Sequence, residues 1–514
     1  MPAAGVAWRP WGSAAFDEAR RTGHLVLLYL TSSWSHSGHQ MDVEAWGDSA
    51  VVAAVLESYV PIRVDADRRP DVADRYLAAG WPTTAVLTAD GQVVVSQSVI
   101  APKALLQMLT NARDLYRKGR AEIERRSAES VRRVAHTWDS EAPGAPQMSL
   151  SDYVDQNLAA LREAEDRTNG GLQGKPKVPQ FEAVHFLLAA AGTRKDLTLR
   201  GLGLRVLDAA MALEDSVWGG FYRIAGEENW KRPHTEKLLD VNARALHALV
   251  SAVDAGGGTR YREAARRTES YATAWLWDAH SGGWFGSQDA DVAIRDGEGR
   301  LLAGEVYYGL SDKLRRGQGT PAVDSSLYAE QNARMASAVL RGAASGIWKG
   351  APVARAVRAL DRLWTAQRAP DGFIYHDWRN GRTAVPGRLA DQGAAGNAYL
   401  DAYAATKEPR HLARAESLAV WIRTRLEDRV GGGFRYAPRD PAAIGRLAAG
   451  EKPPDGNLEA AWLFQRLWEI RGRAEDRRSA RRALDYLRSG DVVTLNPAMA
   501  ELGLRVESGG KAAP

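Results

Sequence analysis

One short segment recurs four times in the second part of this chain, each time after a stretch with helical periodicity. Each copy joins glycine to aromatic residues: Gly219-Gly220-Phe221-Tyr222, Gly282-Gly283-Trp284-Phe285, Gly372-Phe373-Ile374-Tyr375 and Gly432-Gly433-Phe434-Arg435-Tyr436. The copies recur roughly every 60–90 residues, about the length of one helical hairpin with its loops. Because such a hairpin buries its apolar face only against its neighbours, the repeat predicts a closed (α/α)6 barrel of about six hairpins. An open α-solenoid is the alternative.

The sequence from about residue 150 onward agrees with a helical architecture. Alanine-, leucine- and arginine-rich segments there have the period of an amphipathic helix. They predict helices over 151–166, 181–191, 197–213, 237–253, 261–277, 327–341, 353–367, 393–406, 411–425, 456–470 and 476–487.

The first 120 residues have a different pattern, typical of an α/β domain. The continuous apolar run 24–30 predicts a strand that is buried on both faces, and 59–65 predicts a second strand. Asp90-Gly91, between the β-rich runs 81–88 and 92–97, predicts a hairpin. Segments 16–22 and 48–58 are predicted helices.

A polar loop, Trp34-Ser35-His36-Ser37-Gly38-His39, follows the first predicted strand. It resembles the Trp-Cys-x-x-Cys redox loop of thioredoxin-like domains, with Ser35 and Gly38 at the cysteine positions. Trp81-Pro82-Thr83 resembles the cis-proline segment of those domains, so Pro82 is expected to be cis. The chain contains no cysteine, and disulfide exchange needs a thiolate and a resolving sulfur. We therefore expect no redox chemistry, and Ser35 is expected to cap a helix. A metal or ligand site at His36, His39 and Asp42 is the alternative.

Composition narrows the class of protein. The net charge of +5 is small for 514 residues, and acidic residues interrupt the densest basic run, 471–482. Neither feature favours nucleic-acid binding, which uses a concentrated basic stripe. The early apolar run is too short to span a bilayer, and the absence of cysteine fits a cytoplasmic protein. No glycine fingerprint for nucleotide phosphates follows a strand, so we expect no cofactor and no metal.

Pro233-His234-Thr235-Glu236 directly precedes a predicted helix. Thr235 would be the N-cap, and the positive end of the helix would disfavour a protonated His234. A neutral imidazole can act as a general base, with Glu236 as its partner carboxylate. A buried core histidine is the alternative role for His234.

Asp289 and Asp291 stand one residue apart, so they would point the same way in an extended segment. Such a pair can divide acid and base roles or bind sugar hydroxyls. We expect these aspartates, His234 and Glu236 to be the catalytic groups, converging on one cavity. Further candidates for substrate binding are Tyr222, Arg223, Trp284, Glu305, Arg388 and Asp391.

Several motifs resemble those of the DUF255 family, which includes spermatogenesis-associated thioredoxin-domain proteins. They are Gly170-Gly-Leu-Gln-Gly-Lys-Pro-Lys-Val-Pro179, Gly219-Gly-Phe-Tyr-Arg223, Pro233-His-Thr-Glu-Lys-Leu-Leu-Asp-Val-Asn242, Asp289-Ala-Asp291 and Pro454-Asp-Gly-Asn457. The resemblance implies a thioredoxin-like domain followed by a barrel similar to that of N-acylglucosamine 2-epimerases and cellobiose epimerases. This chain departs from the family pattern at the lost cysteines, at Thr235 and in a shortened segment 305–324.

These observations predict a thioredoxin-like domain over 1–120, a linker helix and polar linker over 121–148, and the barrel over 149–514. The expected function is that of a carbohydrate-active barrel with epimerase-like or isomerase-like chemistry, acting on a small molecule such as a sugar. The alternative is a non-catalytic binding protein, in which the thioredoxin-like domain docks a protein partner.

Overall fold

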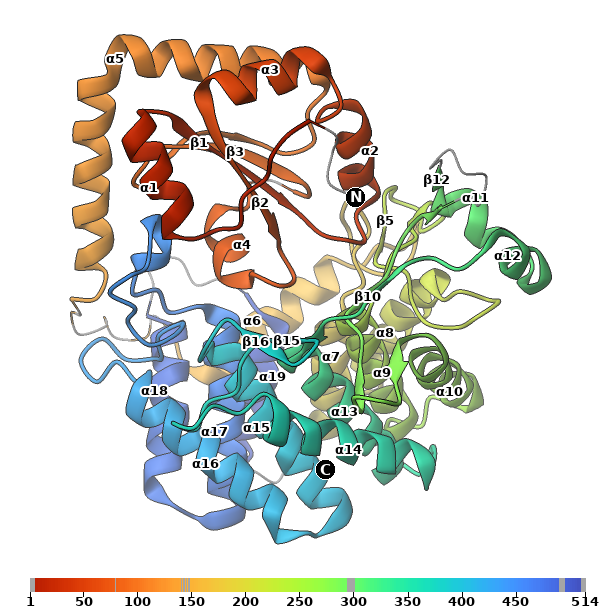
Figure 1. Ribbon diagram of the computed structural model, residues 1–514. Coiled ribbons are helices and arrows are strands. Elements are labelled where there is room, and N and C mark those ends of the chain that lie inside the picture. Colours follow the sequence, from red (N-terminus) through yellow and green to blue (C-terminus); the bar gives the residue numbers. More distant parts are fainter. Residues whose placement is uncertain are drawn as a thin grey trace. The chain divides into compact units, whose positions relative to one another are not determined.

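The computed structural model describes residues 5–78, 80–139, 141, 144, 146, 148–293, 301–489 and 495–509 (Figure 1). The chain divides into two compact units. Unit 1 consists of Met1–Ser140 and Arg439–Glu451, and unit 2 of Glu141–Pro438 and Lys452–Pro514. Each unit has its own hydrophobic core and is described by itself below.

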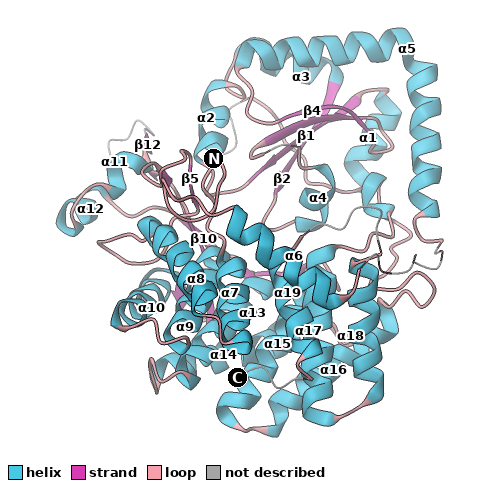
Figure 2. Ribbon diagram, turned by 180° about the vertical axis from the view of Figure 1, so that it is seen from behind, coloured by secondary structure: helices cyan, strands magenta, loops and turns pink. Residues whose placement is uncertain are grey.

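Unit 1 is built on a four-stranded sheet, drawn in magenta in Figure 2. β1 (Leu25–Thr31) pairs in parallel with β2 (Tyr59–Asp65) and antiparallel with β3 (Thr83–Leu87). β4 (Val93–Gln97) completes the sheet through the predicted hairpin with β3. The sheet order is β2-β1-β3-β4, and β1 is buried at every position, as its apolar run predicted.

Apolar clusters cover both faces of this sheet. Leu25, Leu27 and Tyr29 belong to one cluster, while Val26 and Leu28 belong to the other, because successive strand residues point to opposite faces. The first cluster includes residues of α2 (His36–Glu44), α3 (Ser49–Ser58) and α5 (Pro102–His136). The second includes residues of α1 (Ser13–Thr22) and α4 (Pro70–Tyr76).

The extent of unit 1 differs from the predicted domain range in two ways. Residues 121–136 are the second half of α5, which continues past a non-helical Gly119, and they belong to unit 1 rather than to a linker. The distant segment Arg439–Glu451 also belongs to unit 1, with η3 (Gly445–Ala448) inside it. Trp138 Nε1 donates a hydrogen bond to the Ala448 carbonyl at 2.8 Å. Local sequence patterns do not show that a segment so distant in sequence packs as part of unit 1.

Unit 2 is an (α/α)6 barrel. Each of six inner helices packs against the next, and the last packs against the first, which closes the ring and excludes the open solenoid. The inner helices are α7 (Phe181–Arg194), α9 (Leu239–Asp254), α13 (Ala329–Ala344), α15 (Leu389–Thr406), α17 (Pro454–Arg471) and α19 (Pro497–Glu507). The outer helices are α6 (Leu150–Glu163), α8 (Leu197–Ala210), α10 (Thr259–Tyr271), α14 (Ala351–Ala366), α16 (Pro409–Arg425) and α18 (Ala474–Leu487).

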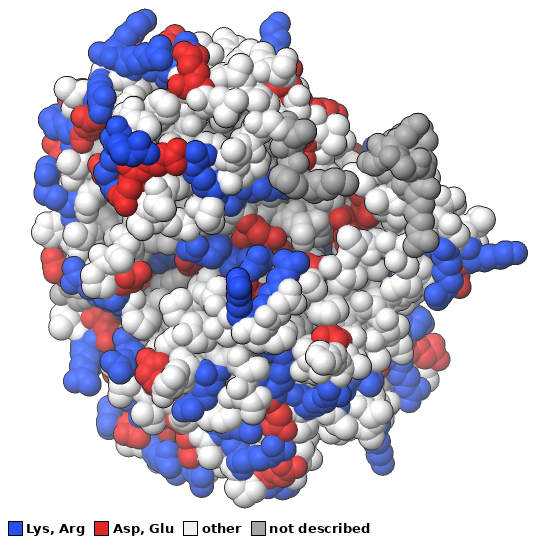
Figure 3. All heavy atoms as spheres, in the orientation of Figure 1, with Lys and Arg blue, Asp and Glu red and all other residues white. Residues whose placement is uncertain are grey.

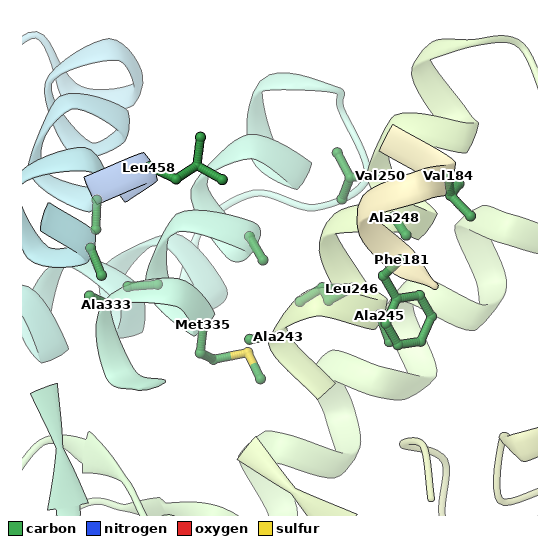
Figure 4. Close-up of a cluster of buried hydrophobic side chains, with 14 of the residues drawn as sticks. Phe181, Val184, Ala243, Ala245, Leu246, Ala248, Val250, Ala333, Met335 and Leu458 are labelled. Carbon is green, nitrogen blue, oxygen red and sulfur yellow. The ribbon is translucent and has the colours of Figure 1, made fainter. Parts of the chain in front are cut away.

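Apolar side chains of the inner helices form a large part of the barrel core. Figure 4 shows Phe181 and Val184 from α7 beside Ala245 and Leu246 from α9, with Met335 from α13. Such contacts bury apolar surface, which contributes about 25 cal/mol for each Å² removed from water. They hold the inner helices at fixed spacing around the barrel axis.

Short strands and helices make up the connections of unit 2. They are η1 (Met211–Leu213), β5 (Ile224–Ala225), β6 (Pro233–His234), β7 (Lys237–Leu238), η2 (Ala272–Leu276), β8 (Trp277–Asp278), β9 (Gly283–Trp284), β10 (Ser287–Gln288), β11 (Val292–Ala293), β12 (Leu301–Leu302), α11 (Gly304–Tyr308), α12 (Asp312–Gln318), β13 (Val323–Asp324), β14 (Leu327–Tyr328), β15 (Asp377–Arg379) and β16 (Arg382–Ala384).

All four glycine–aromatic segments connect an outer helix to the following inner helix. They therefore lie at one end of the barrel, which we call the loop end. Gly220 has a φ of 73°, and a Cβ there would lie 2.3 Å from Tyr271 Cδ1, so the turn requires glycine.

An asparagine on the next inner helix holds each of three aromatic segments. Asn242 Oδ1 accepts from the Phe221 N–H at 2.7 Å, and its amide donates to the Phe221 carbonyl at 3.2 Å. Asn332 holds Trp284 and Asn457 holds Phe434 in the same way. These asparagine clamps give Asn242 and Asn457, both within the family-like motifs, a structural role.

Candidate functional site

The loop that replaces the redox motif has the predicted capping structure. Ser35 is the N-cap of α2, and its hydroxyl accepts from the Gly38 N–H at 3.2 Å. The peptide bond before Pro82 is cis, as predicted. Asp42 binds Arg63 through both carboxylate oxygens, at 2.8 and 2.7 Å, so a guanidinium already occupies this carboxylate of the alternative metal set.

The prediction that His234 stands at a helix start is wrong. His234 ends β6, which pairs with β5, and Lys237 and Leu238 form β7, which pairs with β10. The helix begins only at Leu239, so its terminal dipole, which acts within the first turn, does not extend to His234. Strand pairing prevails here over the capping potential of Thr235, which is buried and donates to the Ala290 carbonyl at 3.3 Å.

The four predicted catalytic residues and one predicted substrate-binding residue, Arg223, lie on neighbouring loop segments. We call this group the loop set: His234, Glu236, Asp289, Asp291 and Arg223. Glu236 is buried and accepts from Arg223 Nε, and Arg223 Nη2 lies 3.4 Å from His234 Nδ1. β7 pairs with β10 (Ser287–Gln288), and Asp289 and Asp291 lie in the segment that directly follows β10. Both aspartates bind backbone: Asp289 Oδ1 accepts from the Asp291 N–H, and Asp291 Oδ1 from the Gly304 N–H, each at 3.1 Å.

The other predicted substrate-binding residues are spread over the loop end. Trp284 lies in the hydrophobic core, 1% exposed, and Glu305 is exposed, 3.7 Å from Arg232. Asp391 is fully buried and lies 2.9 Å from His376 Nδ1, while Arg388 donates to Glu330 at 2.6 Å.

Tyr222 lines a buried charged cluster. The Lys237 ammonium lies 5.3 Å from its ring centroid and donates to Asp215 at 2.6 Å. Burial lowers the pKa of Lys237 to about 8. Arg315 binds the same Asp215 at 2.7 and 3.0 Å, so the carboxylate offsets the two buried cations.

A cavity of about 400 Å³ lies among the inner helices, and all six of them line it. This volume is at the small end of the range of about 300–1,000 Å³ that ligand pockets occupy. Its polar lining residues are Gln180, Glu182, His185, Arg244, His247, Arg334, Ser337, Arg341, Asn397, Asp401, Asp455, Glu459, Arg466, Asn496 and Glu501, together with Trp462.

The polar residues of the cavity form three levels along the barrel axis. Four residues of helix rise about 6 Å, and the inner helices all run away from the loop end. The first level carries Glu182, Arg244, Arg334 and Glu459, and the middle level His185, His247, Ser337, Asn397 and Trp462. The far level carries Arg341, Asp401 and Arg466.

Ion pairs hold the first level in place. Arg334 contacts Asp240 at 2.7 Å and Glu459 at 3.0 Å, and Arg244 contacts Asp240 at 2.8 Å and also Glu182. The nearby guanidinium groups hold the pKa of Asp240 and Glu182 below the usual range against their burial. Both arginines are therefore neutralised by carboxylates within the cavity wall.

Two histidines lie in contact at the middle level. The ring centroids of His185 and His247 are 4.1 Å apart, and His185 Nδ1 lies 2.9 Å from Ser251 Oγ. Burial, reinforced by Arg341, lowers the pKa of His185 to about 4. Burial and the neighbouring His185 lower the pKa of His247 well below its usual value. Both imidazoles are therefore neutral at pH 7.

Glu501 on α19 has the opposite shift. Burial raises its pKa to about 7, and the charges that act on it come from Arg341, Arg505 and Glu182. The cavity thus combines neutral histidines with a carboxyl group that is half protonated near pH 7. Environments that shift the pKa values of two groups in opposite directions are typical of acid–base sites.

The sequence reasoning missed this cavity, although a signal was present. Ser337 and Arg341 stand four residues apart on α13, as Asn397 and Asp401 do on α15 and Trp462 and Arg466 on α17. Polar residues at that spacing share one helix face, and here the face points to the barrel axis. The family-like motifs, by contrast, lie mostly in the loops and at the starts of the helices.

Two further features of the molecule are its surface charge and its hydropathy. On the face drawn in Figure 3, blue basic and red acidic side chains are intermingled over both units. Among the described residues, no helix is long and apolar enough to cross a membrane.

The geometry thus defines a thioredoxin-like unit and an (α/α)6 barrel with a polar central cavity. Residues 2–135 match the family described as protein of unknown function, DUF255 (Thioredox_DsbH). Spermatogenesis-associated protein 20 from Homo sapiens is 26% identical over 323 residues, which cover 59% of this chain and 41% of that protein. The aligned part is thus less than half of that relative. These two matches support the predicted resemblance to the DUF255 family, whose model covers the N-terminal region of this chain.

Solved structures match the barrel fold. A sugar epimerase from a ruminal bacterium is 14% identical with a TM-score of 0.55, covering 71% of this chain and 99% of that one. Cellobiose 2-epimerase from Bacillus thermoamylovorans is 11% identical with a TM-score of 0.54, covering 70% of this chain and 98% of that one. At these identities the likeness establishes the fold.

Proposed function

We propose that the barrel binds a carbohydrate in its central cavity and rearranges it by acid–base chemistry, as an epimerase or isomerase does. The observation that carries the proposal is the pair of neutral histidines, His185 and His247, in a polar cavity lined by all six inner helices. Ser337, Asn397 and Glu459 supply donors and acceptors of the kind that sugar hydroxyls use, and Trp462 supplies an aromatic face. The barrel fold of sugar epimerases supports the assignment.

The proposed reaction begins with proton removal. His185 takes the proton from the carbon beside the sugar carbonyl, and the C–H electron pair moves toward the carbonyl, whose oxygen takes a proton from water to give an enediol. Protonated Glu501 then gives its proton to carbon while an enediol hydroxyl releases its proton to water and the carbonyl re-forms. Proton exchange with water restores neutral His185 and protonated Glu501. Return on the opposite face gives an epimer, and return to the former carbonyl carbon gives an isomer. This step needs no external oxidant or reductant.

The loop set is the second candidate site. A specific observation favours it: Arg223 joins the buried Glu236 to His234, so a base, a carboxylate and a guanidinium stand together. In that version His234 takes the proton and one aspartate of the Asp289–Asp291 pair returns it. The non-catalytic alternative assigns the barrel a supporting role and the thioredoxin-like unit a protein partner.

Solvent exchange at carbon tests the proposal directly. The protein is incubated in D₂O with a panel of mono- and disaccharides, and deuterium at the carbon beside the carbonyl is measured by NMR together with any new sugar. Exchange that His185→Asn abolishes supports the cavity site. Exchange that persists in His185→Asn and disappears in His234→Asn assigns the chemistry to the loop set. No exchange and no bound sugar across the panel would favour the non-catalytic alternative.

A further inference from the structure

The far level of the cavity carries an excess of positive charge. Arg341 and Arg466 share the single carboxylate of Asp401, at 3.6 Å from Arg341 Nε and 2.6 Å from Arg466 Nη2. Asp401 also accepts from the Ser337 hydroxyl at 2.5 Å. The first level differs, because its arginines are paired with several carboxylates.

Of the two arginines at the far level, Arg341 is the less completely paired with acceptors. Its Nη1 donates to His247, which is neutral, and its Nε lies too far from Asp401 for a hydrogen bond. Within the part of the chain that the structure describes, no acceptor lies within hydrogen-bond distance of its Nη2. Arg466, by comparison, binds Asp401 and also donates to the Asn397 carbonyl at 3.0 Å.

A half-buried guanidinium without a full set of acceptors favours an anionic ligand. Its fork of donors matches a carboxylate or a phosphate, and such charge-assisted bonds are about twice as strong as neutral ones. A neutral sugar would leave the excess charge of the far level unpaired in a confined space, which costs free energy.

We propose that the cavity takes a sugar that carries one anionic group, a carboxylate or a phosphate, and that this group binds Arg341 at the far level. The inference rests on the proposed function and names its class of substrate. The sugar ring would then lie at the middle level, beside His185, His247 and Trp462, about one helical turn closer to the loop end.

Glu501 should make the binding of an anionic sugar depend on pH. The charges that act on it come from Arg341 on α13, Arg505 on its own helix and Glu182 on α7. His185 on α7 and Arg466 on α17 line the same cavity. Arg505 is paired with Glu469 at 2.6 Å. When Glu501 is protonated the cavity is more positive, so an anionic sugar should bind more tightly at pH 6 than at pH 8. Glu501→Gln should remove most of that difference.

Calorimetric titration tests the inference with glucose, glucuronate, glucose 6-phosphate and inorganic phosphate, and with the matching mannose series. The expected result is that one anionic sugar binds at least tenfold more tightly than its neutral parent. Arg341→Met should lose that preference, and Arg341→Lys should keep part of it. The control is Arg205→Gln on the outer helix α8, which removes the ion pair of the exposed Arg205 with Glu165 and should change neither affinity. Comparing the affinity for glucuronate with that for glucose 6-phosphate shows whether the cavity prefers a carboxylate or a phosphate.

Three results would overturn the inference. Equal affinity for neutral and anionic sugars would remove it and leave the proposed function intact. The same would follow if the folded Arg341→Met variant, checked by circular dichroism, kept the full preference. Binding of inorganic phosphate alone, with no sugar bound and no carbon-bound deuterium, would remove both the inference and the proposed function.

Discussion

Arg341 donates a hydrogen bond to Nε2 of His247. Because a guanidinium can only donate, Nε2 must be the acceptor, and the neutral His247 ring carries its proton on Nδ1. The lone pair that could remove a proton from a substrate is thus engaged in His247. His185 binds Ser251 through Nδ1, which leaves its Nε2 for the proposed base.

The two histidines should therefore differ in their contribution to catalysis. His185→Asn should lower the rate of carbon-bound hydrogen exchange by about 10²–10⁴, the usual contribution of a general base. His247→Asn should have the smaller effect, because its ring orients Arg341. The measurement is the initial exchange rate in D₂O, with the melting temperature as the check on folding. A larger loss in His247→Asn would reverse the two roles.

Glu501 should make stability depend on pH. Burial raises its folded-state pKa to about 7 from 4.5, so its protonated form contributes stability that is fully present below pH 4.5 and is lost as the pH rises through 7. Wild type should lose about 3 kcal/mol of unfolding free energy relative to Glu501→Gln between pH 4.5 and 8. Denaturant unfolding of both proteins across this range measures it. A constant difference between them would show that the carboxyl group titrates normally.

His185 acts in the opposite direction over part of the same range. Its folded-state pKa is lowered to about 4 from 6.5, so its contribution is present above pH 6.5 and is lost as the pH falls toward 4. Both proteins in the Glu501 comparison contain His185, so its contribution largely cancels in their difference. The His185→Asn variant, measured alone, should be less sensitive to acid than wild type.

The asparagine clamps should matter for stability rather than for activity. Asn242→Ala leaves the buried N–H and carbonyl of Phe221 without partners, which costs about 1–3 kcal/mol for such a group. Asn229→Ala, on the surface of the same loop region, is the matched control and should change stability by less than about 0.5 kcal/mol. Urea unfolding distinguishes the two, and equal midpoints would contradict the clamp.

Restoring the redox cysteines should require a third substitution. A Cβ at Gly38 would lie 2.4 Å from Thr31 Oγ1 and 3.2 Å from Ser35 Cβ. The second distance is close to the usual 3.5–4.5 Å of a disulfide, while the first is a clash. Ser35→Cys with Gly38→Cys should therefore be destabilised, and adding Thr31→Ala should relieve it. Insulin reduction measures exchange, and wild type should show none. An inactive but folded triple variant would count against the thioredoxin-like interpretation of this loop.

The sequence predicted most of the barrel because each hairpin is locally determined. Apolar periodicity marked the helices, and glycine–aromatic segments marked the turns between them. It missed α19 (Pro497–Glu507), a short helix with a weak pattern, and this helix supplies Glu501. At Thr235 a good N-cap residue was overruled by strand pairing with a segment distant in sequence, which no local pattern records.

The site was harder to predict than the fold. Loop residues such as His234 and Asp289 stood out because they belong to recognisable motifs. The cavity residues are single polar positions within ordinary amphipathic helices, and a charged residue such as Arg341 usually faces solvent in that context. These side chains face one shared cavity only because the ring is closed. Closure depends on contacts between segments far apart in the chain, which a local pattern does not record.

That closure has a consequence for the order of assembly. The helices that complete the ring, α7 and α19, lie near opposite ends of the barrel sequence, and no covalent bond joins them. During synthesis the wall of the cavity stays open on one side until α19 has left the ribosome and docked. A chain interrupted before Pro497 would display the charged interior to water, as an incomplete arc that quality-control proteases could attack.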